Sequence, residues 1–178
     1  MRVAAKAKVT FSNRAWRELA DNVNELGRSH VKVGILAGKG ADTPGDDTSL
    51  TLAQIAAIHE YGAPAANIPE RSFLRRTFRL HSAALGNTTA RLAKLVLARK
   101  LTNTAALNLL GMWASSKVKR EITGAQHIPP PLAEKRSPTG RLLWSTAERK
   151  GSDRPLVDTG QLVNSITHVV STGIGDDA

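Results

Sequence analysis

The sequence predicts an α+β fold, in which helices pack on a small twisted antiparallel sheet of three or four strands and a long proline-rich arm extends from the domain. Apolar residues recur every two residues in some segments and every three or four in others. A chain of 178 residues, 41% of them hydrophobic, is sufficient for one core, so a single domain over 1–178 is expected. Residues 124–155 follow neither period and contain three consecutive prolines, which predicts the arm.

The first part of the chain is expected to form a strand, a helix, a second strand and a loop. Alternating apolar and polar residues predict strands over 5–11 and 31–37. A helix is predicted between them, because Ser12 can cap it and Gly27 can end it. Its apolar face comprises Trp16, Leu19, Ala20, Val23 and Leu26. Residues 38–48 are rich in Gly, Asp and Pro, which is typical of a loop.

The next segment is predicted to contain two helices joined by a turn. A helical pattern runs over 49–61 and ends at Gly62, and residues 63–68 are expected to turn the chain. Pro69 is expected at the first position of a new helix that continues through Phe78, because proline fits the first helical turn.

Two longer helices and a short C-terminal helix complete the prediction. The longer helices are expected over 87–101 and 104–122, with breaks at Gly86 and at 102–103. After the arm, a short helix is predicted over 158–166 and a last strand over 167–171.

The composition excludes some classes of protein. The chain has no cysteine, so disulfides and thiolate metal sites are not expected and a reducing cytoplasm suits it. No apolar run approaches the roughly 20 residues of a membrane-spanning helix. Residues 1–11 do not have the pattern of a signal peptide. We therefore expect a soluble, unprocessed protein that does not contact a membrane.

The net charge of +10 is concentrated in the middle of the chain. Residues 1–70 contain 8 basic residues (Lys and Arg) and 8 acidic ones (Asp and Glu). Residues 71–150 contain 16 basic and 3 acidic residues, and residues 151–178 contain 1 basic and 4 acidic residues. A basic block of this kind attracts nucleic acid or an acidic face of a protein. Aromatic residues make up only 4% of the chain, which argues against a base-stacking surface.

Motifs that carry catalysis are incomplete. Residues 34–40 resemble a phosphate-binding loop, but three residues separate the glycines where the motif needs four, and no hydroxyl follows the lysine. His59 and Glu60 resemble the start of a zinc-protease motif, yet Ala63 stands where the second histidine belongs. We therefore assign no catalytic, cofactor-binding or metal-binding residue and expect no enzyme. A hydrolase built from His59, Glu60 and the aspartates of the 38–48 loop is a weaker alternative.

Five segments in a fixed order carry a family resemblance. They are VKVGILA at 31–37, LAQIAAIHEYG at 52–62, NIPERSFLR at 67–75, IPPPL at 128–132 and RPLVDTGQLVNSI at 154–166. In this order the segments resemble the tail-component family of long-tailed double-stranded DNA bacteriophages, which includes neck and tail-completion proteins. The resemblance spans most of the chain.

The resemblance implies a structural protein of the virion. Subunits of this family would form a six-fold ring at the head-proximal end of the tail, in the neck. There the ring would join the tail terminator to the head–tail connector, and its lumen would pass the genome. The sequence departs from the family pattern at Ser72, where relatives commonly have a second proline.

The family motifs also supply the candidate subunit interface, because arginine and aromatic side chains are enriched at interface hot spots. The candidates are His59, Glu60, Tyr61, Gly62, Ile68, Pro69, Arg71, Phe73, Leu74, Pro129, Pro130, Pro131, Leu156, Asp158, Thr159 and Gly160. The alternative is that Phe73, Leu74 and Phe78 are ordinary core residues, since large apolar side chains are usually buried. Residues 158–160 are interpreted first as the start of the short C-terminal helix, with Asp158 or Thr159 near its cap, and secondly as a contact surface.

Arg75, Arg76 and Arg79 are candidates for facing DNA in the lumen of the ring. If they and the rest of the basic block bind phosphates in the free subunit, the chain is instead a nucleic-acid-binding module. This module is the main alternative function.

Overall fold

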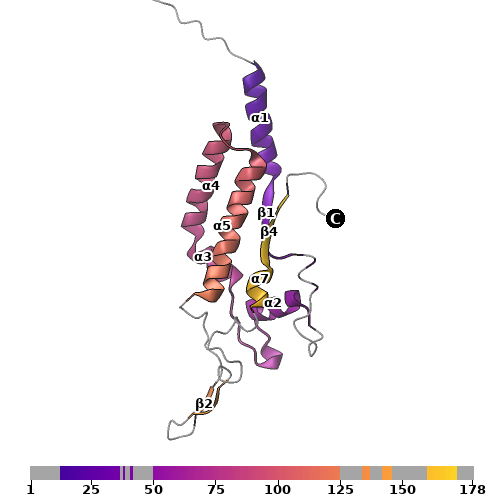
Figure 1. Cartoon of the computed structure of the whole chain (residues 1–178), viewed down its shortest axis with the longest axis vertical. Helices are drawn as coiled ribbons and strands as arrows, with labels where there is room; N and C mark the ends of the chain where they lie inside the picture. Colours follow the sequence, from indigo (N-terminus) through magenta and orange to yellow (C-terminus); the bar gives the residue numbers. More distant parts are fainter. Residues whose placement is uncertain are drawn as a thin grey trace, which may run out of the picture.

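The computed structural model describes residues 13–36, 38, 41, 50–124, 134–136, 142–145 and 160–171. Within these ranges the fold is of the mixed α+β class. Figure 1 shows α4 and α5 side by side, with strands β1 and β4 along α5. Helix α1 projects beyond the α4–α5 pair at one end of the molecule, and α2 and α7 lie near the other end (Figure 1).

The main sheet consists of two antiparallel strands. Strand β1 (His30–Ile35) pairs with β4 (Ile166–Ser171), from His30 opposite Ser171 to Ile35 opposite Ile166. Both strands are confirmed predictions, although their first residues differ by one from the predicted ones. Strands β2 (Glu134–Arg136) and β3 (Leu142–Ser145) form a second antiparallel pair.

The predicted sheet differs from the observed one, and the predicted arm lies mostly outside the described residues. The described strands form two sheets of two strands each, where one sheet of three or four was expected. The strand predicted over 5–11 and the loop over 38–48 lie almost entirely outside the described residues. Most of 124–155 also lies outside them, so the arm stays a prediction, and the β2–β3 pair within it was not predicted.

Helices α1 (Asn13–Arg28) and α2 (Leu52–Tyr61) form where the apolar spacing predicts them. The turn that follows α2 is also confirmed and contains the short 3-10 helix η1 (Pro64–Ala66). Helix α7 (Gln161–Ser165) is shorter than predicted and begins after Gly160.

The boundaries of α3 and α4 differ from the prediction. Helix α3 (Leu74–Leu80) begins five residues after Pro69, and α4 (Ser82–Leu97) follows after His81 alone. Gly86 lies inside α4 and does not break it, because a glycine costs a helix only about 1 kcal/mol and packing of the other residues outweighs that cost. Helix α5 (Asn103–Thr123) begins one residue before its predicted start, where Thr102 Oγ1 accepts a hydrogen bond from the N–H of Ala105 at 3.2 Å.

Two apolar clusters hold these elements together. The larger cluster joins α2, the residue before α3, α5, α7 and β4, and its buried members are Ala56, Phe73, Val118, Ile122, Leu162 and Ile166. The smaller cluster joins α4 to α5 through Leu92, Val96 and Ala106. Helix α5 contributes to both clusters and also contacts β1 and β4, so it is the central element of the fold.

Helix α5 approaches β4 closely at Gly111. A Cβ atom at this position would lie 2.2 Å from Cδ2 of His168, which is too close for any side chain. The absence of a side chain at Gly111 therefore leaves room for the His168 side chain of β4 against α5. No helix in the described ranges combines the length and apolar character that crossing a membrane requires.

Candidate functional site

Most of the candidate interface residues that the structure describes lie between the end of α2 and the start of α3. We call this segment, residues 59–75, the α2–α3 corner. Helix α2 begins with a capping box, in which Thr51 and Gln54 each accept a hydrogen bond from the backbone N–H of the other. It ends at Gly62, whose φ is 76°. A Cβ at position 62 would lie 2.9 Å from the backbone nitrogen of Glu70, so the close approach and the backbone conformation both require glycine.

The chain reverses after Gly62 and returns along the end of α2. Ala63 and Ile68 exchange two backbone hydrogen bonds of 2.9 and 3.0 Å across the turn. The N–H of Arg71 then donates to the carbonyl oxygen of His59 at 2.7 Å. These bonds fix residues 69–72 in a non-helical conformation, which explains why the helix does not begin at Pro69.

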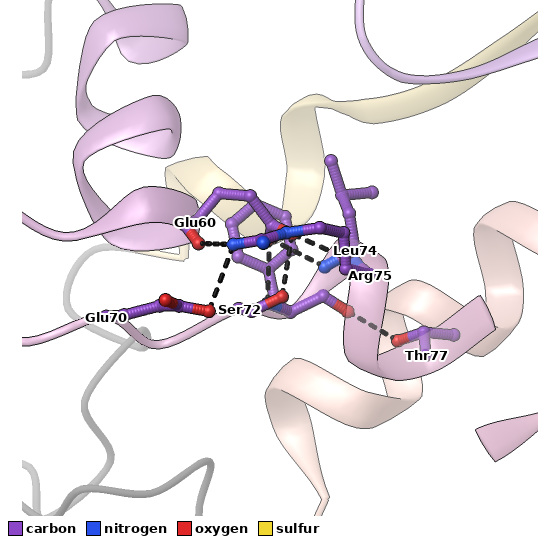
Figure 2. A network of polar contacts seen from close by, with 7 residues as sticks. Glu60, Glu70, Ser72, Leu74, Arg75 and Thr77 are labelled. Atoms are coloured by element: carbon purple, nitrogen blue, oxygen red, sulfur yellow. Dashed lines mark hydrogen bonds and ion pairs between the residues drawn. The ribbon is translucent and has the colours of Figure 1, made fainter. Parts of the chain in front are cut away.

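The carboxylate of Glu60 lies at the centre of the corner (Figure 2). Its Oε2 accepts hydrogen bonds from the backbone N–H groups of Phe73 and Leu74, both at 2.9 Å. Its Oε1 accepts one from the N–H of Arg75 at 2.9 Å and one from Oγ of Ser72 at 2.8 Å. The first N–H groups of a helix have no partner within the helix. Glu60 therefore caps α3 with a side chain from the preceding helix, and its negative charge suits the positive end of the helix dipole.

The guanidinium group of Arg75 closes the corner on its outer side. Its Nε donates to Oε1 of Glu60 at 3.0 Å, and its Nη2 donates to the backbone oxygen of Glu60 at 2.6 Å. The same Nη2 donates to Oε1 of Glu70 at 3.0 Å, as Figure 2 also shows. The guanidinium carbon lies 4.8 Å from the centre of the Tyr61 ring, a cation–π contact. One exposed arginine thus connects two glutamates and an aromatic ring.

These contacts determine the charge states in the corner. Burial by itself raises the pKa of Glu60. Hydrogen bonds lower it by more, and they come from the backbone of Arg75 and Leu74 and from the side chains of Ser72 and Arg75. The pKa of Glu60 therefore lies below its ordinary value. The hydrogen bond to Glu60 is the main cause that raises the pKa of Arg75. Burial lowers the pKa of Arg71. Glu60 is therefore an ionised carboxylate at neutral pH.

The structure corrects the role of three candidate interface residues. Phe73 is 0% exposed and packs in the larger apolar cluster, so it is a core residue of the subunit and not an exposed anchor. Glu60 and Arg71 are 4% and 6% exposed. A side chain that its own subunit covers offers no surface to a neighbour, so these three act on the shape of the corner.

The other described candidates differ in exposure. Tyr61 is 67% exposed, and Pro69 is exposed beside it in the chain. His59, Gly62, Ile68 and Leu74 are partly buried, and Leu74 packs against the larger cluster. Gly160 is partly buried at the start of α7, with a φ of 75°. The remaining candidates lie outside the described residues; they are Pro129, Pro130, Pro131, Leu156, Asp158 and Thr159.

Two of the three arginines assigned to DNA form ion pairs within the subunit. Arg75 binds Glu60 and Glu70, as described above. Nε of Arg76 lies 2.7 Å from Oε1 of Glu121 on α5, and both side chains are largely buried, at 26% and 17% exposure. Arg79 is exposed on α3, and no ion pair joins it to a carboxylate among the described residues. Arg75 and Arg76 thus have carboxylate partners within their own chain, and contact of the three arginines with DNA stays a prediction.

Sequence reasoning missed the roles of Ser72 and Glu70. Ser72, the position where the family pattern has a proline, donates its hydroxyl hydrogen to Glu60. No local capping signal predicts this role, because the hydroxyl donates to a carboxylate 12 residues earlier and does not accept a helix N–H. No sequence signal marks the pair of Arg76 and Glu121, which lie 45 residues apart.

Among the residues with described positions, no group of three or more His, Cys, Asp or Glu side chains could hold a metal ion. Comparisons of the chain with protein-family models, with curated proteins and with solved structures give no match.

Proposed function

We propose that this chain is a structural protein of a bacteriophage particle and not an enzyme. In this proposal it forms a six-fold ring in the neck, at the head-proximal end of the tail, and joins the tail terminator to the head–tail connector. The protein is made in the cytoplasm of the bacterial host and requires no cofactor.

The observation that carries the proposal is the construction of the α2–α3 corner. Of the described motif residues, Glu60, Tyr61, Phe73 and Leu74 line a small pocket of about 200 Å³ together with apolar side chains of α2 and β1. The buried carboxylate of Glu60 accepts five hydrogen bonds, which come from Ser72, Phe73, Leu74 and Arg75. A carboxylate saturated in this way has little capacity left to act as a base, but it makes a rigid corner.

The same bonds hold an exposed contact surface in place. The guanidinium carbon of Arg75 lies 4.8 Å from the centre of the Tyr61 ring, and its Nη2 lies 3.0 Å from Oε1 of Glu70. Aromatic and arginine side chains that are fixed before binding lose less conformational entropy on association. The exposed part of the corner, Tyr61, Pro69, Glu70 and Arg75, therefore suits contact with a neighbouring protein.

The nucleic-acid-binding module is the second candidate, and one observation favours it. Helix α4 carries Arg91 and Lys94, both exposed, and has no acidic residue over Ser82–Leu97. Binding of the free subunit to duplex DNA, measured at several salt concentrations, tests this function, because phosphate contacts give a steep loss of affinity with salt. Weak binding with a shallow salt dependence would argue against it.

Disruption of the gene in its phage tests the proposed function. We expect the lysate to contain complete heads and complete tails that are not joined, visible by electron microscopy, and we expect the purified chain to restore joining. Joined particles in the disrupted lysate would overturn the proposal.

A further inference from the structure

We draw no further inference here: the strongest candidate, the apolar groove of about 570 Å³ between α1, β1 and the α4–α5 pair, carries none because nothing in the part of the chain that the structure describes shows what covers it.

Discussion

Glu60 binds Arg75 at two points, because its Oε1 accepts hydrogen bonds from the backbone N–H of Arg75 at 2.9 Å and from the side-chain Nε at 3.0 Å. The first bond belongs to the cap of α3, and the second orients the exposed guanidinium group beside Tyr61. One buried carboxylate thus controls both where α3 begins and what the corner presents to solvent.

The Glu60→Gln variant should be clearly less stable than the wild type. The amide keeps one acceptor oxygen but directs an NH₂ group toward N–H donors, which leaves buried groups unpaired at a cost of about 1.5–3 kcal/mol. For a chain of this size we expect the melting temperature to fall by roughly 3–12 °C. Glu70→Gln is the control, because the Glu70 side chain is 55% exposed and its ion pair should contribute little. Equal melting temperatures for Glu60→Gln and Glu70→Gln would contradict the capping role.

The stability that Glu60 provides should disappear in acid. The pKa of Glu60 in the folded chain lies below its ordinary value of 4.5, so protons bind the unfolded chain more readily than the folded one. The contribution is therefore complete above the ordinary pKa and is lost as the pH falls through the pKa of the folded state. Denaturant unfolding of the wild type and of Glu60→Gln over this range measures it. The difference between the two free energies of unfolding should shrink below pH 4.5; a constant difference would show that the charge of Glu60 is not what matters.

Two glycine variants should change stability in opposite directions. Gly62→Ala places a Cβ 2.9 Å from the backbone nitrogen of Glu70 at a positive φ, so it should destabilise the chain by more than about 1 kcal/mol. Gly86→Ala lies within α4 and has no atom within 4 Å of the added Cβ, so it should stabilise the chain by up to about 1 kcal/mol. Thermal unfolding of both variants measures the effects. The opposite order would mean that Gly62 is not constrained by the corner.

Two aromatic variants separate core from surface. Phe73→Ala removes a fully buried side chain and should cost about 3–5 kcal/mol, or roughly 6–20 °C in melting temperature. Tyr61→Ala removes a side chain that is 67% exposed, so its melting temperature should change little while head–tail joining becomes less efficient. Melting curves beside a joining assay measure both properties. Normal joining by the Tyr61→Ala protein would remove Tyr61 from the interface.

The arginines of α3 should differ in their effect on folding. Arg76→Gln breaks a largely buried ion pair with Glu121 and should lower stability by about 1 kcal/mol or more. Arg79→Gln changes an exposed side chain and should leave the melting temperature unchanged. A double-mutant cycle of Arg76 and Glu121 measures their coupling. A coupling energy of zero would show that the ion pair with Glu121 does not stabilise the folded chain.

Much of the fold could be predicted from the sequence where local patterns are strong. The alternation of Val31, Val33 and Ile35 predicts β1, and the apolar spacing with Gly62 as a terminator predicts α2. Such patterns are reliable because burial of one face decides the conformation.

The start of α3 could not be predicted, because the deciding group is distant in sequence. Pro69 is a good first helical residue, yet the Glu60 carboxylate accepts the N–H groups of Phe73 and Leu74, 13 and 14 residues away. Local helix propensity therefore favours a start of α3 at Pro69, but the tertiary hydrogen bonds to Glu60 place its first residue at Leu74. The sequence motifs locate the candidate site, but they do not show which of its aromatic side chains is buried. Only the three-dimensional structure shows that Phe73 is buried and Tyr61 is exposed.

The native mass of the purified wild-type chain, measured together with electron micrographs of the same sample, tests the central claim most directly. The account predicts one closed oligomer of six subunits, seen as a ring with a central opening. A chain that remains monomeric at every concentration, or that grows into open-ended filaments, would contradict it.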